Sequence, residues 1–213
     1  MKISMLLLMT AIIMMSSNIK ATADSREELK VGAKFGGNYS NVYDTEGEEF
    51  DADAKFGFAL GGYVSIPLGK IISIQPELLY SQRGFQGTGK VLGFGYDFTR
   101  TTHYLDIPIL VVFKPSENIS ILAGPQYSYL MKQSDDFNNP IANLDIDKEF
   151  ENDDIRENTF CFVGGVDINV ENFVVGARVG WDLFNNNGDG TSTTPRYKNT
   201  WVQLTVGFNL FRK

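Results

Sequence analysis

The stretch FVVGARVGWDL (173–183) decides the fold of this chain. Its odd positions are apolar throughout, from Phe173 to Leu183, whereas its even positions include glycines, Arg178 and Asp182. Side chains of a β-strand point alternately to opposite faces, so this period of two predicts a strand with one apolar and one polar face. A helix would repeat its apolar residues every three or four positions, and no segment of the sequence sustains that period.

Seven further segments alternate in the same way. Each run is about 11 to 13 residues long, which exceeds a usual globular strand and is close to the roughly 9 to 11 residues that a tilted strand needs to cross a bilayer. Strand length is therefore the first indication of a membrane. The apolar residues of these seven runs lie within 29–39, 56–66, 72–80, 105–113, 119–129, 160–168 and 202–210, and each run extends slightly beyond them.

The connections between the runs alternate in length. Outer-membrane barrels have short periplasmic turns and long external loops, and an even number of strands returns both termini to the periplasmic side. The sequence therefore predicts an all-β fold, an eight-stranded antiparallel up-and-down transmembrane β-barrel with four long external loops and three short periplasmic turns. The long connections lie around 40–55, 84–100, 131–157 and 185–198, and the short ones at 67–70, 114–118 and 170–172.

Alternation alone leaves open which face meets water, because a soluble lipocalin-like barrel buries its apolar face inside. The chemistry of the two faces separates these alternatives. No charged residue occurs on the apolar face of any run, and the other face consists mostly of Gly, Ser, Thr and Gln. A soluble barrel would carry a Lys- and Glu-rich exterior, so the small polar face is better explained as the lining of a narrow lumen.

Composition limits the class of protein further. The chain has 213 residues, 21 glycines, one cysteine and a formal charge of −7. A single cysteine excludes a disulfide framework and a cysteine zinc cluster. The acidic balance and the lack of clustered Lys and Arg indicate no nucleic-acid partner. Only one long apolar run exists, which excludes a helical protein with several spans.

That apolar run is N-terminal and short. Lys2 precedes an apolar stretch over 3–15, and the small residues Ala21-Thr22-Ala23 follow it. This is the pattern of a secretory signal peptide over 1–23, whereas a membrane anchor would need about 20 apolar residues. The outer-membrane barrel domain is then expected over 24–213, in the cell outer membrane. Without its first 23 residues the chain has 17 basic against 26 acidic residues, a formal charge of −9.

Aromatic residues of the apolar face concentrate at the ends of the runs. Such clustering predicts two aromatic girdles at the two membrane interfaces. The girdle residues are Tyr39, Tyr80, Tyr127 and Trp181 at the long-loop ends and Phe113, Phe173 and Phe208 near the short turns.

Three prolines, Pro76, Pro108 and Pro125, fall inside the predicted strands. Each removes a donor from the hydrogen-bonded ladder, so local bulges are expected there.

Several of these segments resemble a known family. GAKFGGNYS (32–40), IQPELLYSQRGF (74–85), HYLDIPILVVFK (103–114) and ILAGPQYSYLM (121–131) together resemble the PorT-type outer-membrane β-barrel family of Bacteroidetes. VGGVDINV (163–170), GARVGW (176–181) and VQLTVGF (202–208) extend the resemblance over nearly all of the chain after the signal. The resemblance implies a single eight-stranded, OmpA/OmpX-like barrel in the outer membrane. The secretion and gliding role of the name-giving member would be transferred on fold alone, so we do not transfer it.

Polar residues at comparable heights on the inward face predict a buried plug. Opposite charges must pair in a lumen of low dielectric, so Glu77 and Asp106 are expected to neutralise Lys34 and Arg178. The alternative is a gated proton or ion path, but eight strands leave no aqueous channel once side chains fill the lumen. The plug residues are Lys34, Glu77, Asp106, Gln126, Arg178 and Asp182.

No residue pattern indicates an enzyme or a cofactor. Barrel enzymes that act on lipid A use a histidine with a serine and a carboxylate, whereas the single histidine, His103, is expected on the apolar face without a neighbouring serine. Cys161 is expected to be a buried packing residue. The acidic segment 131–157 is expected to be a solvated charge run and the loop 185–196 a set of turns, with no metal site. The alternative is calcium or magnesium binding, but Arg196 replaces the glutamate of a calcium loop.

The sequence thus favours a monomeric structural or surface-interaction protein that acts through long acidic external loops. Its expected partners are outer-membrane lipid and lipopolysaccharide, with surface or envelope proteins as further partners. The alternative is an accessory component of an outer-membrane transport or protein-secretion system. The ligand and the phenotype are left open, because function in such barrels resides in loops that no motif decodes.

Overall fold

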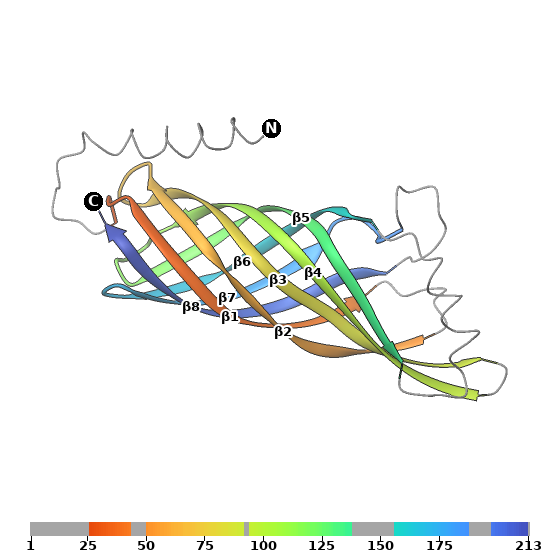
Figure 1. Cartoon of the computed structure of the whole chain (residues 1–213). Coiled ribbons are helices and arrows are strands. Elements are labelled where there is room, and N and C mark those ends of the chain that lie inside the picture. Colours follow the sequence, from red (N-terminus) through yellow and green to blue (C-terminus); the bar gives the residue numbers. More distant parts are fainter. Residues whose placement is uncertain (1–25, 44–49, 92–93, 138–155, 188–196, 213) are drawn as a thin grey trace, which may run out of the picture.

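The computed structural model describes residues 26–43, 50–91, 94–137, 156–187 and 197–212. Over these ranges the chain forms a closed barrel in which each strand pairs antiparallel with the next and β8 pairs with β1 (Figure 1). This confirms the predicted fold class. The strands are β1 (Lys30–Tyr43), β2 (Phe50–Pro67), β3 (Ile72–Val91), β4 (Phe94–Phe113), β5 (Ile119–Phe137), β6 (Asn158–Val170), β7 (Phe173–Asp182) and β8 (Lys198–Arg212).

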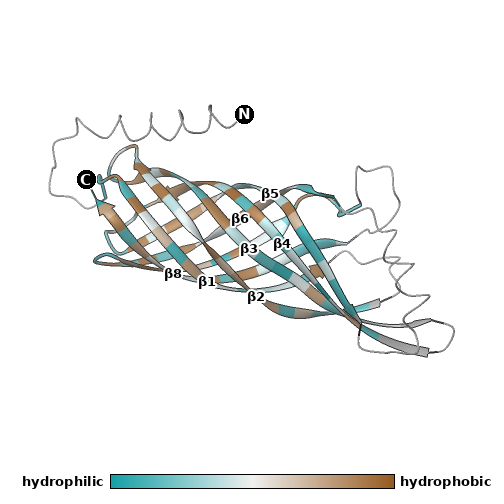
Figure 2. Cartoon of the chain, in the orientation of Figure 1, coloured by the Kyte–Doolittle hydropathy of each residue, from teal (hydrophilic) through white to brown (hydrophobic). Residues whose placement is uncertain are grey.

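The apolar face of each strand forms the exterior of the barrel. In β7 exposed and buried residues alternate without a break: Phe173 is 54% exposed and Val175 50%, whereas Arg178 is 3% exposed. Figure 2 shows apolar and polar residues alternating along the strands around the barrel. Such an exterior is unfavourable in water but matches the hydrocarbon core of a bilayer, where a closed barrel satisfies all backbone hydrogen bonds.

Short connections gather at one end of the barrel. Residues 68–71, 114–118 and 171–172 join β2 to β3, β4 to β5 and β6 to β7, as the sequence predicts. Both ends of the described chain lie at this end too, because β1 and β8 pair from Lys30 and Arg212 onward. No helix in the described part of the chain is long and apolar enough to span a membrane.

Four strands continue well past the others at the opposite end (Figure 1). Strands β2 to β5 have 18, 20, 20 and 19 residues, whereas β7 has 10. The β1–β2 ladder reaches the pair Ser40–Lys55, and the β5–β6 ladder reaches the pair Tyr129–Asn158. Beyond these pairs β2 to β5 remain paired with one another. We call this sheet, residues 50–54, 82–91, 94–103 and 131–137, the outer extension.

The outer extension corrects the predicted loop boundaries. The sequence predicts loops around 40–55, 84–100 and 131–157, but residues 40–43, 50–55, 84–91, 94–100 and 131–137 are strand. Above the membrane both faces of a sheet are hydrated, so the apolar alternation that marks a membrane strand fades. Glycines at 84, 87 and 89 weaken the strand pattern further.

The expected bulges at the prolines are also wrong. The register is unchanged on both sides of Pro76, Pro108 and Pro125. Each proline is paired with one neighbouring strand, to Ile109, Gln126 and Phe162 respectively, while pairing beside it lapses on the other. The ladder therefore lacks the hydrogen bonds that proline cannot donate, and no extra residue is inserted.

Register shifts occur elsewhere. They lie between Val31 and Gly32 against β8, between Ala54 and Ala59 against β3, and between His103 and Tyr104 against β5. Two of the three are therefore at the base of the outer extension, where β2 and β5 leave the closed barrel.

Candidate functional site

A group of charged side chains fills the half of the lumen nearer the short turns. Glu77 on β3 accepts hydrogen bonds from Lys34 Nζ on β1 and, at 2.7 Å, from Arg178 Nη1 on β7. Arg178 Nη2 also donates to Asp167 on β6 at 3.3 Å. These four side chains are at most 5% exposed. Two acids and two bases thus balance among nearly fully buried side chains, which is the condition for keeping such charges buried.

A second group lies in the half of the lumen nearer the outer extension. Arg83 Nη2 donates to Asp106, and Ser128 Oγ donates to the same carboxylate at 2.6 Å. The guanidinium of Arg83 lies 3.6 Å from the centroid of the Trp201 ring and 4.7 Å from that of Tyr104. The arginine therefore combines an ion pair with cation–π contacts on two rings.

The expectation that Asp106 neutralises Lys34 or Arg178 is wrong. Asp106 pairs in register with Leu79, four residues along β3 from Arg83. The long side chain of Arg83 spans that separation and reaches Asp106 from the side of the outer extension. The plug predicted from the sequence does not include Arg83, because alternation reports the face of a residue but not the reach of its side chain.

Glycine at position 180 makes room for the aromatic partner of Arg83. A Cβ atom at Gly180 would lie 2.2 Å from the Trp201 ring, so only a residue without a side chain fits beside it. Gly32 does the same for Tyr63, whose ring would lie 2.4 Å from the added Cβ. These inward glycines let bulky rings enter a narrow lumen.

The remaining plug residues are tied to neutral groups. Asp182 accepts hydrogen bonds from the Asn199 backbone at 3.0 Å, from Asn199 Nδ2 at 2.6 Å and from Cys161 Sγ at 3.1 Å. Gln126 Nε2 donates to Ser128 Oγ at 3.0 Å. All six residues of the plug expected from the sequence lie in the lumen, but in separate groups: Lys34, Glu77 and Arg178 together, Asp106 and Gln126 around Ser128, and Asp182 with Asn199.

An aromatic cap covers the outer mouth of the lumen. Phe85 contacts Phe98 and Tyr197 edge to face, with ring centroids 5.6 and 5.2 Å apart, and all three are at most 3% exposed. Arg100 donates to both carboxylate oxygens of Asp135 at 2.8 Å and to Tyr197 Oη at 2.6 Å. Burial alone would lower the pKa of Arg100, but Tyr197 and Asp135 raise it above its ordinary value. The sequence missed this cap, because most of it falls in predicted loops.

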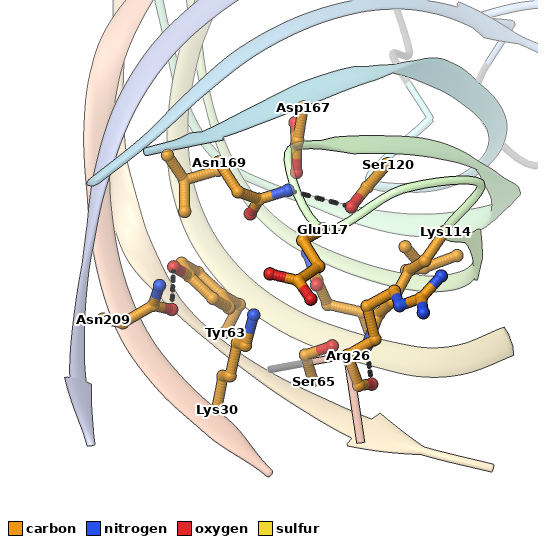
Figure 3. Close-up of a pocket in the computed structure, with 13 residues that line it drawn as sticks. Arg26, Lys30, Tyr63, Ser65, Lys114, Glu117, Ser120, Asp167, Asn169 and Asn209 are labelled. Carbon is orange, nitrogen blue, oxygen red and sulfur yellow. Dashed lines mark hydrogen bonds between the residues drawn. The ribbon is translucent and has the colours of Figure 1, made fainter. Parts of the chain in front are cut away.

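A polar vestibule opens at the other end of the barrel (Figure 3). Tyr63 Oη donates to Asn209 Oδ1 at 2.9 Å, and Asn169 Nδ2 donates to Ser120 Oγ at 3.0 Å. Asp167, the partner of Arg178, also lines it. Charged groups at its wall are Arg26, Lys30, Lys114, Glu117 and Asp167.

The expected girdle residues all lie on the outward face. Trp181 is 37% exposed, Tyr39 49%, Phe113 46%, Phe173 54% and Phe208 40%. Tyr80 and Tyr127 are half-buried. Neighbouring rings contact across the strands, with centroids 4.7 to 5.6 Å apart, in the pairs Tyr39–Phe56, Phe58–Tyr80, Tyr127–Phe160, Phe162–Trp181 and Phe173–Phe208.

His103 lies on the outward face beside the outer girdle. Its Nδ1 is 2.5 Å from Tyr80 Oη, and the two ring centroids are 5.8 Å apart. A hydrolytic triad would instead need a serine and a carboxylate on the imidazole. Within the described ranges no three His, Cys, Asp or Glu side chains gather to hold a metal ion. Most of the acidic segment 131–157, residues 188–196 of the second loop and the signal sequence lie outside the described residues, so those hypotheses remain predictions.

The comparison with protein families agrees with the observed class of fold. A family model described as outer membrane protein beta-barrel domain matches residues 20–188. No curated protein sequence matches the chain.

Solved structures similar to this one share little sequence with it. Ail of Yersinia pestis, solved with the heparin analogue sucrose octasulfate, is 15% identical, with a TM-score of 0.47 and coverage of 87% of this chain and 99% of Ail. Neisserial surface protein A is 10% identical, with a TM-score of 0.49 and coverage of 86% and 99%. OprG of Pseudomonas aeruginosa is 13% identical, with a TM-score of 0.45 and coverage of 87% and 98%.

Proposed function

Given that this chain belongs to the outer membrane protein beta-barrel domain family, we propose that it is a non-conducting, non-enzymatic barrel that acts at the cell surface as a structural or interaction protein. The filled lumen carries this proposal. From the short turns outward, a path along the axis meets the Glu77 group, the Arg83 group and the aromatic cap around Phe85. Three successive layers of buried side chains leave the outer surface as the part of the molecule that is available for function.

The outer extension supports a role in surface interactions. It carries β2, β3, β4 and β5 beyond the closed barrel, so its outermost strands, β2 and β5, each have one side that pairs with no other described strand. Sheet edges of this kind present backbone donors and acceptors to a partner. The acidic loops that the sequence places at the same end would add a charged rim.

Planar-bilayer recording tests the filled lumen. The purified barrel is expected to give no stable conductance. The variants Glu77→Ala and Arg178→Ala, which each remove one of the buried charges, distinguish a plug from a gate. A stable wild-type conductance that changes in these variants would establish an ion path and overturn the proposal.

The role in surface interactions is tested by shortening the outer extension. Residues 87–98 are replaced by Asn-Gly, which leaves Gln86 and Thr99 as the closing pair of a two-residue hairpin. Affinity purification from the native host in mild detergent is expected to recover a surface partner with the full barrel and to lose it with the shortened one. Heat-modifiable gel mobility shows that both fold.

The same purification addresses the alternative of a transport or secretion accessory, including a PorT-type role. The vestibule favours contact at the periplasmic end, because it is lined by charged groups and opens at that end of the barrel. A periplasmic or membrane partner recovered equally with both barrels would support the accessory role and reject the surface role.

Lipid A mass spectrometry tests the absence of enzymatic activity. Lipid A from cells with and without the protein is expected to be identical. An acyl-chain difference that is abolished in His103→Ala would instead identify a lipid A enzyme.

A further inference from the structure

Two lysines and the single histidine gather on the outward surface at the base of the outer extension. His103 on β4 pairs with Lys132 on β5. Lys55 from β2 donates its Nζ to Thr101 Oγ1, two residues along β4 on the same face. Removal from water and the positive charges of Lys132 and Lys55 lower the pKa of His103, which lies outside the membrane-spanning part of β4. The two lysines supply the positive charge of this surface.

Both lysines reach this surface only because of register shifts. By alternation from Tyr129, which faces outward, Lys132 would face the lumen. The β4–β5 ladder pairs Tyr104 with Leu130 but His103 with Lys132, so Met131 is an extra residue that turns Lys132 outward. A bulge commonly redirects a side chain in this way.

The second shift turns Lys55 in the same direction. Alternation with Phe56 would direct Lys55 inward, but β2 residues 55–58 oppose only three residues of β3, 82–84. Lys55 then crosses β3 to reach Thr101, and Gly84, the β3 residue paired with Thr101, offers no side chain in its way.

The surroundings of this patch are lipid-facing on one side. Phe58, Tyr80 and His103 form a continuous row of rings on β2, β3 and β4, with centroids 5.4 and 5.8 Å apart. Met131 is 45% exposed directly beside Lys132. The positive charge therefore begins where the apolar exterior ends, at the depth of lipid headgroups.

The charge of the patch stands out against the rest of the chain. The protein carries a formal charge of −7, and Asp136 is the acidic residue that acts on Lys55. The net negative charge of the chain repels a soluble polyanion, whereas an anion held in the membrane lies beside the patch already. Position and charge both favour a lipid as the source of the anion.

We infer that Lys55, Lys132 and His103 form a binding site for the phosphate of a lipid headgroup in the outer leaflet. Lysines act on phosphate as point charges, and the imidazole adds a hydrogen bond through Nε2 while Tyr80 contacts its Nδ1. The acyl chains of the same lipid would lie along Met131 and the row of aromatic rings.

Native mass spectrometry of the detergent-purified barrel tests this site, with bis-phosphorylated lipid A as the probe. The wild type is expected to retain it and not its dephosphorylated form. Retention should fall about tenfold in Lys55→Gln/Lys132→Gln, since lysines near headgroups contribute most of such binding. It should be kept in Lys55→Arg/Lys132→Arg and in Lys70→Gln, which removes an exposed charge from the β2–β3 turn.

Several outcomes would overturn the site. Equal retention of phosphorylated and dephosphorylated lipid A would show that only the acyl chains bind. Equal retention by the wild type and the Gln/Gln variant, with both heat-modifiable on gels, would show that the lysines are not involved. Binding of a sulfated oligosaccharide through the same lysines, without binding of lipid A, would assign the patch to a soluble polyanion instead. None of these results depends on whether the barrel has a surface partner.

Discussion

At the scale of single residues, glycines in the lumen make room for large neighbouring side chains. Gly180 has no side chain, so Trp201 can occupy the space that a Cβ would take and stack on Arg83. The guanidinium can then stay in a dry lumen with one acid partner, Asp106. A neutral glycine thus determines whether a buried charge is tolerated.

Replacing that glycine should destabilise the barrel. Gly180→Ala places a methyl group 2.2 Å from the Trp201 ring, and overpacking of this kind costs about 1 to 3 kcal/mol. The midpoint of heat-induced mobility change on gels should fall. Gly164→Ala is the matched control, because its Cβ would meet only the Leu122 carbonyl at 3.8 Å. Equal midpoints for the two variants would contradict the close packing at Trp201.

Removing the acid shared by two bases should cost more. Glu77→Gln leaves Lys34 without its acid partner and Arg178 with Asp167 alone, and breaking a buried ion pair costs about 3 to 5 kcal/mol. The free energy of unfolding in urea should fall accordingly. Adding Lys34→Met should recover part of the loss, since the cation that needs Glu77 is gone. A double variant that loses as much stability as Glu77→Gln and Lys34→Met together would show that the charges are not coupled.

At the scale of elements, bulges decide which face a residue occupies. Alternation predicts the inward or outward face of the membrane-spanning residues up to the outer girdle. Beyond it, the register shifts in β2 and β5 reverse the predicted faces. The prolines, where the sequence predicts bulges, leave the register intact. A missing donor only removes a bond, whereas a bulge adds a residue and turns everything beyond it by one position.

Cysteine labelling checks the shift in β5. In a Cys161→Ala background, Lys132→Cys should react quickly with a water-soluble maleimide, because Lys132 is exposed on the outer face. Gln133→Cys should react slowly, because that position lines the cavity under the aromatic cap. Without the bulge at Met131 the two rates would be reversed.

At the scale of the whole molecule, the barrel presents three zones: an apolar belt, a filled polar lumen and an outer extension. The belt explains how a chain of acidic, slightly hydrophilic composition is a membrane protein. The polar lumen and the hydrated outer residues offset the apolar exterior in any average over the sequence, so only the face-by-face pattern reveals the belt.

Membrane fractionation checks this architecture. The protein should be found in the outer-membrane fraction and migrate differently on gels with and without boiling, because a closed barrel resists unfolding in detergent at room temperature. The mass of the isolated protein should correspond to a chain that begins at Asp24, if residues 1–23 are a signal peptide. A mass that includes those residues would indicate an uncleaved anchor.

The sequence by itself determined the eight strands, the face that each strand turns to lipid and the short turns between them. These properties follow from a local period of two, which any single strand displays. Tertiary structure alone decided that Asp106 pairs with Arg83, that the predicted loop over 84–100 is a paired extension, and that Lys55 and Lys132 face outward. Those outcomes depend on the register between strands that are distant in the chain. One extra residue reverses the face of every residue beyond it, and the sequence pattern does not show where that residue is.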